Sequence, residues 1–308
     1  MDVAWACPAC RAPLEQVAPG CMLCPAGGCT YRRHDGIWRF LTPEKAAYYG
    51  PFVADYECVR RQEAWGNDDR AYYRALPFKD LSGRYPFIWQ IRTRTYRALL
   101  AEVVQPLAQA RGRPLHMLDL GAGNGWLSYR LAQQGHRVAA VDLSTDCHDG
   151  LGAHRWYGTE AAFVPVQATF EELPWCPDIA DLVIFGGSIH YAIDYEATLR
   201  ETLRVLRRDG RVVIMDSPTY HDPGSGAEMT RERQVRFREQ YNIPHDALPH
   251  ENYLTFDRLE ELATLLGLSW RAVEPFYGWR WALQPWLARL RGRREPARFI
   301  LFVGRQTQ

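Results

Sequence analysis

The chain has 308 residues, of which 47% are hydrophobic and 13% aromatic, so it has enough apolar material for a sizeable buried core. Lysine and arginine total 37 against 36 aspartates and glutamates, which excludes the strong positive charge of a dedicated nucleic-acid coat protein. The first ten residues lack the basic and apolar parts of a secretory signal, and no apolar stretch is long enough to span a membrane. We therefore expect a cytoplasmic globular protein.

Cysteines are concentrated near the N-terminus, where five of the eight occur: Cys7, Cys10, Cys21, Cys24 and Cys29. In a reducing cytoplasm, closely spaced thiols in a segment too small to build its own core favour a structural metal over disulfides or buried free thiols. Zinc takes four such ligands. We expect Cys7, Cys10, Cys24 and Cys29, because Pro25 and the following glycines form a turn between the last two. Cys21 is the alternative, since it has the usual C-x2-C spacing with Cys24.

The chain divides into a small module (1–45), an aromatic-rich helical connector (46–113) and a region of alternating strands and helices (114–308). Within the last region we expect strands near 115–120, 137–143, 162–166, 181–187, 211–217 and 299–303, helices at 124–134, 146–158, 194–207 and 255–266, and a polar insertion at 218–250. Such alternation predicts an α/β fold, in which helices cover a parallel sheet.

The strongest chemical signal is a glycine-rich turn after the apolar strand at 115–120. Gly121, Gly123 and Gly125 let the backbone turn tightly and approach a ligand, and the helix that follows presents free N–H groups. The dinucleotide fingerprint G-x-G-x-x-G would place its third glycine where this chain has Trp126. The turn therefore predicts a ligand other than a dinucleotide.

Two acidic residues indicate what that ligand is. Asp119, just before the first glycine, would repel a pyrophosphate but suits a cation. Asp142 ends the next strand, where a carboxylate can accept both hydroxyls of a ribose. With the glycines, these acids predict a site for an adenosine that carries an amine and a sulfonium. A dehydrogenase-type or inactive nucleotide fold is the alternative.

At this point the sequence resembles the class I S-adenosylmethionine (SAM)-dependent methyltransferases, in order from residue 115 to about residue 217. The motifs that carry the resemblance are DLGAGNG at 119–125, VDLS at 141–144, QATFEELPW at 167–175, DLVIFGGSIHY at 181–191 and TLRVLRRDGRVVIMD at 202–216. The resemblance implies a Rossmann-like sheet of seven mostly parallel strands, with SAM as the cofactor.

The resemblance also implies where the parts of SAM bind. Asp119 and the glycines would line the methionine end, Asp142 the ribose, and Leu143 the adenine. The expected cofactor-binding residues are Asp119, Gly121, Ala122, Gly123, Asn124, Asp142, Leu143, Thr169, Phe170 and Gly186. One position departs from the family: Thr169 stands where an aspartate often meets the adenine amino group, although threonine can still accept a hydrogen bond.

The N-terminal cysteines resemble a zinc ribbon, with CPAC at 7–10, CMLCPAGGC at 21–29, and TYRRHDGIWRFL at 30–41 as the strand that follows. A ribbon ahead of such a domain is similar to the RlmA-type ribosomal RNA guanine methyltransferases. Similar ribbons also precede bacterial methyltransferases of small molecules. The ribbon is therefore interpreted either as a brace for the domain or as a surface for RNA or a partner.

Methyl transfer is an in-line displacement, so the protein chiefly aligns donor and acceptor, with a general base where the acceptor needs one. The acceptor is expected at the carboxyl ends of the fourth and fifth strands, where the candidate bases are His190, Tyr191, Asp216 and His221. GGSI at 186–189 replaces the Asn-Pro-Pro-Tyr-like sequence of enzymes that methylate base amines. That difference argues against an exocyclic base amine as the acceptor.

We favour a small or medium-sized metabolite as the acceptor, with RNA base methylation as the alternative and a non-enzymatic scaffold or adaptor as a third possibility. The segment at 65–78 is interpreted as a lid or as an amphipathic helix, and the Arg- and Trp-rich segment at 277–299 as a nucleic-acid or membrane-surface patch or an ordinary surface. The aromatic residues expected to wall the acceptor pocket are Trp65, Tyr72, Tyr73, Tyr191, Tyr220 and Tyr241. The sequence does not specify the oligomeric state.

Overall fold

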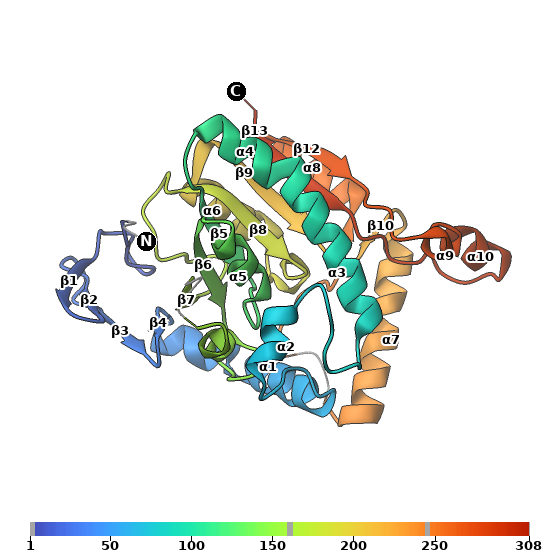
Figure 1. Cartoon of the computed structure of the whole chain (residues 1–308), viewed down its shortest axis with the longest axis horizontal. Coiled ribbons are helices and arrows are strands. Elements are labelled where there is room, and N and C mark those ends of the chain that lie inside the picture. The colour runs from blue at the N-terminus through green and yellow to red at the C-terminus, as the bar shows by residue number, and fades with distance from the viewer. Residues whose placement is uncertain (1–3, 159–162, 244–246, 308) are drawn as a thin grey trace.

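The computed structural model describes residues 4–158, 163–243 and 247–307. Within these residues, eleven strands form one sheet in the order β1-β2-β3-β4-β7-β6-β5-β8-β9-β13-β12 (Figure 1). The strands are β1 (Glu15–Ala18), β2 (Cys21–Leu23), β3 (Thr30–His34), β4 (Ile37–Arg39), β5 (His116–Leu120), β6 (Arg137–Asp142), β7 (Val164–Gln167), β8 (Ala180–Gly186), β9 (Leu206–Met215), β12 (Leu268–Val273) and β13 (Leu301–Gln306). A separate parallel pair joins β10 (Thr219–Tyr220) to β11 (Leu254–Thr255).

Helices cover both faces of this sheet. They are α1 (Pro43–Gln62), α2 (Arg70–Ala75), α3 (Pro86–Leu99), α4 (Gln105–Arg111), α5 (Trp126–Gln133), α6 (Tyr195–Val205), α7 (Pro223–Tyr241), α8 (Phe256–Leu266), α9 (Trp279–Ala282) and α10 (Gln284–Leu290). Side chains alternate along each strand, so Leu118 and Leu120 face the core shared with α6 and α8, whereas Met117 faces the core shared with α3 and α5. The result is a three-layer α/β fold.

The sheet differs from the expected seven mostly parallel strands. Seven strands, from β7 to β12 in the sheet order, include the expected set, and β7, β6, β5, β8 and β9 are mutually parallel. However, β4 pairs in parallel with β7, with Trp38 opposite Val166, and so adds the antiparallel strands β1–β4 to the edge. The sheet is therefore larger and mixed. Local sequence gives no sign of a pairing between segments about 130 residues apart.

Two further expectations about local structure are corrected. The helix expected at 146–158 is only a short 3₁₀ helix at Leu151–Trp156, since the Asp146 side chain caps a turn by accepting the N–H groups of His148 and Asp149. The polar insertion at 218–250 contains the long helix α7, whose N-cap Asp222 accepts two backbone N–H groups. Residues 162 and 244–246 of the expected segments lie outside the described residues.

The C-terminal segment forms a helical arm that projects from the sheet on the side away from the N-terminal module (Figure 1). It exposes large apolar side chains, with Trp279 77%, Trp286 70% and Leu290 82% exposed. None of the described helices combines the length and the apolar character needed to cross a lipid bilayer.

Candidate functional site

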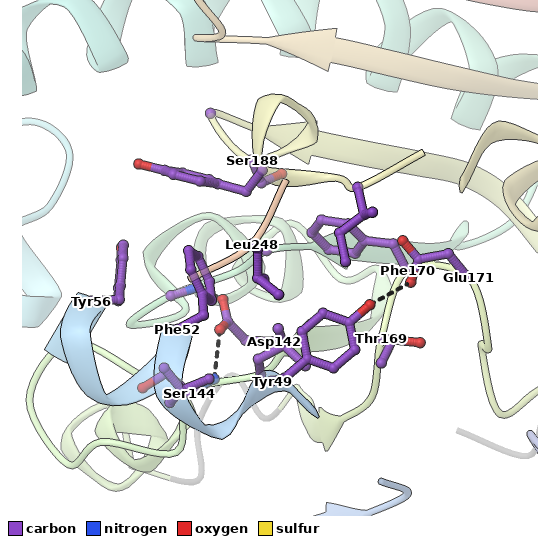
Figure 2. Close-up of a pocket in the computed structure, with 17 residues that line it drawn as sticks. Tyr49, Phe52, Tyr56, Asp142, Ser144, Thr169, Phe170, Glu171, Ser188 and Leu248 are labelled. Atoms are coloured by element: carbon purple, nitrogen blue, oxygen red, sulfur yellow. Dashed lines mark hydrogen bonds between the residues drawn. The ribbon is translucent and has the colours of Figure 1, made fainter. Parts of the chain in front are cut away.

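The carboxyl ends of β5, β6, β7 and β8 meet at one edge of the sheet, and a pocket opens there (Figure 2). Its space is about 740 Å³ with the open mouth included, which lies in the range of small-molecule sites. Open α/β sheets place ligands at this edge, where the strand order reverses. Here the order reverses between β5 and β8.

The glycine-rich turn after β5 forms part of the pocket floor. Gly121 has φ +75°, and a Cβ atom at this position would lie 2.2 Å from the Cβ of Ser188. Only glycine therefore allows the loops after β5 and β8 to meet. Gly123 (φ +54°) also lines the pocket, as expected from the sequence.

Asp142 at the end of β6 organises this floor. Its Oδ2 atom accepts the Gly123 N–H at 2.8 Å, and its Oδ1 atom accepts the Ser144 N–H at 2.9 Å. Burial raises the pKa of this carboxyl to about 6, although these backbone hydrogen bonds act in the opposite direction. Each oxygen retains a lone pair for a ligand hydroxyl.

The far end of the pocket is lined by Leu143, Thr169 and Phe170. The Thr169 hydroxyl is buried beside the Glu171 carboxyl, and it makes no hydrogen bond of normal geometry among the described residues. A buried polar group without a partner is costly, so this hydroxyl is available to a bound molecule. Glu171, which the sequence reasoning missed, also lines this end and accepts a hydrogen bond from the Tyr49 hydroxyl at 3.4 Å.

Helix α1 forms the roof, a role that the sequence reasoning did not assign to it. Tyr49, Phe52, Val53 and Tyr56 point into the pocket from this helix. Their spacing of i, i+3, i+4 and i+7 marks one helical face, a signal that was present in the sequence. The parallel pairing of β4 with β7 explains the location, because β4 ends at the pocket edge and α1 begins four residues later.

Polar contacts fasten the roof to the loops below it. Besides the Tyr49–Glu171 bond, the Ser144 hydroxyl donates to Glu57 at 2.7 Å, and Arg60 pairs with the buried Asp149. The Arg60 guanidinium also lies 3.8 Å from the centre of the Trp65 ring. Helix α1 is therefore attached at both ends of the pocket.

Four expected cofactor residues do not line the pocket. Asp119 is buried beneath it and accepts the Ser128 hydroxyl at 2.7 Å, while burial raises its pKa to about 7. Asn124 lies just before the N-cap of α5, and its side-chain oxygen accepts the Trp126 N–H at 3.2 Å. Ala122 and Gly186 are next in sequence to residues that line the pocket, Ala122 in the glycine-rich turn and Gly186 at the end of β8, but neither lines it.

The four candidate bases are not brought together. Tyr191 lines the pocket, whereas His190 is buried beside Ser217, with Nδ1 3.2 Å from the hydroxyl oxygen. Burial lowers the pKa of His190 well below its usual value, so this imidazole is neutral. Asp216 faces away from the pocket at the end of β9, and His221 lies outside it against Arg298. Only Tyr191 meets the geometric requirement for contact with an acceptor.

Most of the expected aromatic walls also lie elsewhere. Tyr72 and Tyr73 are buried in the core beside α5, and Trp65 stacks on Tyr85 with ring centres 4.0 Å apart. Tyr220 is buried on β10, and Tyr241 donates to Glu63. The segment at 65–78 thus packs within the fold, and α1 takes the covering position predicted for it.

The N-terminal cysteines form a second cluster, remote in sequence from the pocket. The sulfur atoms of Cys7, Cys10 and Cys24 all lie within 4.8 Å of one another. Gly27 lies beneath them, since a Cβ there would be 3.7 Å from the Cys24 sulfur and 3.8 Å from the Cys29 sulfur. Cys21 lies on β2 outside this group.

Residues 118–214 match the family model described as a methyltransferase domain. This span contains the strands from β5 to β9 and most of the pocket floor. This part of the chain is therefore similar to a methyltransferase domain.

Two curated relatives each match about two fifths of the chain. A sarcosine/dimethylglycine N-methyltransferase from Halorhodospira halochloris is 32% identical over 127 residues, which are 41% of this chain and 46% of that protein. A demethylmenaquinone methyltransferase from Clavibacter sepedonicus is 34% identical over 125 residues, or 40% and 48% of the two chains. The chain spans about half the length of these relatives.

Among solved structures, one from Galdieria sulphuraria, named provisionally as a sarcosine dimethylglycine methyltransferase, superposes with a TM-score of 0.50 at 17% identity. The superposition covers 70% of this chain and 86% of that one. At this identity the likeness establishes the fold.

Proposed function

We propose that this protein is a SAM-dependent methyltransferase of a small-molecule acceptor. The observation that carries the proposal is the pocket built by Gly121, Asp142 and Thr169 at the carboxyl edge of a methyltransferase domain. The relatives whose names specify small acceptors support the second half of the proposal.

The chemistry of the pocket fits SAM. Asp142 offers free lone pairs to the ribose hydroxyls, and the Thr169 hydroxyl faces the end where the adenine would lie. The bare backbone at Gly121 and Gly123 leaves room for the methionine portion. When bound, SAM supplies an electrophilic methyl group.

The residues of this chain then position the reactants and exclude water. Helix α1 covers the pocket with Phe52 and Tyr56. Tyr191 closes the side that faces a neighbouring cavity, which lies between α1 and α7. Alignment of this kind accounts for a large part of the rate in a displacement reaction, and no covalent intermediate is needed. Tyr191 is the side chain that we assign to orient the acceptor through its hydroxyl.

We further propose that Cys7, Cys10, Cys24 and Cys29 hold one structural Zn²⁺ in a ribbon. The closeness of three of the sulfur atoms and the position of Gly27 against the fourth support this ligand set over one with Cys21. Zinc ligation by thiolates also agrees with the expected cytoplasmic location. The ribbon acts as a brace, because it adds its strands to the sheet edge from which α1 departs.

RNA methylation is the alternative, and the arginines that it would need are partly occupied. Arg39 donates to Gln167 at 3.2 Å, and Arg294 pairs with Glu232 at 2.9 Å. Submicromolar binding of structured ribosomal RNA that weakens steeply with salt, together with its methylation, would favour this alternative. A small-molecule enzyme is expected to bind RNA only non-specifically, with Kd of roughly 10⁻⁴ to 10⁻⁶ M.

Calorimetric titration with SAM tests the cofactor assignment. The wild-type protein should bind SAM, and Asp142→Ala should weaken binding by about 1.5 to 3 kcal/mol, the range for hydrogen bonds to a charged group. From the sequence, the position of this carboxylate at a strand end predicts little loss of stability in the variant. The structure predicts a loss, because two backbone N–H groups lose their acceptor. Unchanged SAM affinity in a folded variant would contradict the site.

A further inference from the structure

A second cavity adjoins the cofactor pocket, and the two share an aromatic wall. Phe52, Tyr56 and Tyr191 line both spaces. The second space is about 1010 Å³ with its mouth included, and α7 forms its opposite side. A molecule in this cavity would thus lie beside the cofactor pocket, across a wall that includes these aromatic side chains.

Arg233 of α7 is the distinctive side chain of this second cavity. It is half-buried, donates to the Tyr191 hydroxyl at 2.7 Å, and lies 5.1 Å from the centre of the Phe237 ring. Within the described ranges, no carboxylate lies within 4 Å of its guanidinium, in contrast to Arg60 and Arg294, which pair with acids. Only one of its five N–H donors thus has a side-chain acceptor in the described residues.

No described acidic side chain of the cavity forms an ion pair with this arginine, although the carboxylate of Glu63 attracts it from beyond ion-pair distance. Glu63 accepts the Trp65 indole N–H at 2.9 Å and the Tyr241 hydroxyl at 3.1 Å, so both of its oxygens are engaged. Asp55 lies on α1 and forms no ion pair with Arg233. A partly buried cation without a paired anion is unfavourable unless a ligand supplies the anion.

We propose that the second cavity binds the methyl acceptor through an oxyanion, a carboxylate or a phosphate, at Arg233. A planar guanidinium donates two parallel hydrogen bonds to either group. The rest of the acceptor would lie against Phe52 and Tyr56 and reach the cofactor pocket past Tyr191, whose hydroxyl Arg233 holds in place. This inference rests on the proposed function and specifies the class of its acceptor.

Calorimetry on the full chain, saturated with S-adenosylhomocysteine, tests the inference with four probes of similar size. Benzoate and phenyl phosphate carry the two oxyanions, benzamide is a neutral analogue of benzoate, and benzylamine is cationic. We expect at least one oxyanion to bind about tenfold or more tightly than benzamide, and the ratio of benzoate to phenyl phosphate affinity to tell which oxyanion is preferred.

Arg233→Gln should abolish that preference while S-adenosylhomocysteine still binds. Arg238→Gln is the matched control, since Arg238 lies on the same helix, is exposed and does not line the cavity. If neither oxyanion exceeds benzamide, if benzylamine binds best, or if Arg233→Gln keeps the preference, the inference is overturned. Wild-type protein that fails to bind S-adenosylhomocysteine would instead contradict the proposed function itself.

Discussion

The strands beneath the pocket and the strands of the N-terminal module belong to one sheet, but different interactions stabilise them. In β8, six of seven residues are buried, and Val183 and Phe185 are fully enclosed between helices. In β1 all four residues are exposed, and in β3 only Tyr31 is buried. The central strands thus have a core on both faces, whereas in the module only the short strands β2 and β4 bury most of their residues.

The module is attached to the sheet by a small aromatic cluster and closed by its thiols. Trp5 stacks on Trp175 and on Phe40, with ring centres 5.3 and 5.2 Å apart. Cys7 and Cys24 are fully buried at the edge of the same cluster. From this contrast we expect the pocket floor to be stabilised mainly by its apolar core, and the proposed ribbon to depend on a bound metal.

We therefore expect removal of the metal to change the stability of the module more than any other change considered below. The purified protein should contain one zinc per chain, and Cys10→Ser should lose it and unfold the module, because structural zinc contributes about 10 to 16 kcal/mol in zinc-finger peptides. Elemental analysis and hydrogen exchange at β2–β4 measure both effects, with Cys58→Ser on α1 as the control. Metal-free protein with fully protected module strands would show that the aromatic cluster alone is sufficient.

The same contrast explains what the sequence predicted. The glycine-rich turn and Asp142 were found because their spacing along the chain is local and their chemistry is specific. The roof was not found, although the face of α1 was readable, because its position depends on the pairing of β4 with the distant β7. Helix α7, with Arg233, was missed because its polar sequence has almost no apolar stripe.

A second prediction concerns the close contact between Gly121 and Ser188 in the pocket floor. Gly121→Ala should destabilise the protein by about 2 to 5 kcal/mol, since left-handed backbone strain of about 1 to 2 kcal/mol adds to the clash with Ser188. Urea unfolding measures the loss. Gly135→Ala has a similar φ of +85° but open space around it, so it should show only the strain. Equal losses in the two variants would mean that the close approach at Gly121 is unimportant.

A third prediction concerns the buried acid beneath the floor. The pKa of Asp119 is about 7 in the folded protein, above that of the unfolded chain, so its contribution to stability is greatest below pH 4 and falls as the pH rises to about 7. Asp119→Asn is always neutral and can still accept from Ser128. The variant should match wild type at pH 4.5 and exceed it by about 2 to 4 kcal/mol at pH 7.5. A pH-independent difference in urea unfolding would contradict the buried position.

The last prediction concerns the roof, helix α1, where we expect the weakest change. It asks whether a contact of the roof contributes to cofactor binding more than to the stability of the fold. Tyr49→Phe removes one long hydrogen bond to Glu171, worth about 0.5 to 1.5 kcal/mol, and leaves the ring in place. SAM affinity should fall about two- to tenfold, and the free energy of unfolding should fall by no more than about 1.5 kcal/mol, because α1 keeps its links through Glu57 and Arg60. Tyr48→Phe is the control, because Tyr48 is the preceding residue and is 51% exposed; it should change neither quantity. A drop in stability without a drop in SAM affinity would mean that this hydrogen bond stabilises the fold and does not contribute to cofactor binding. At this position the roof would then behave like the floor.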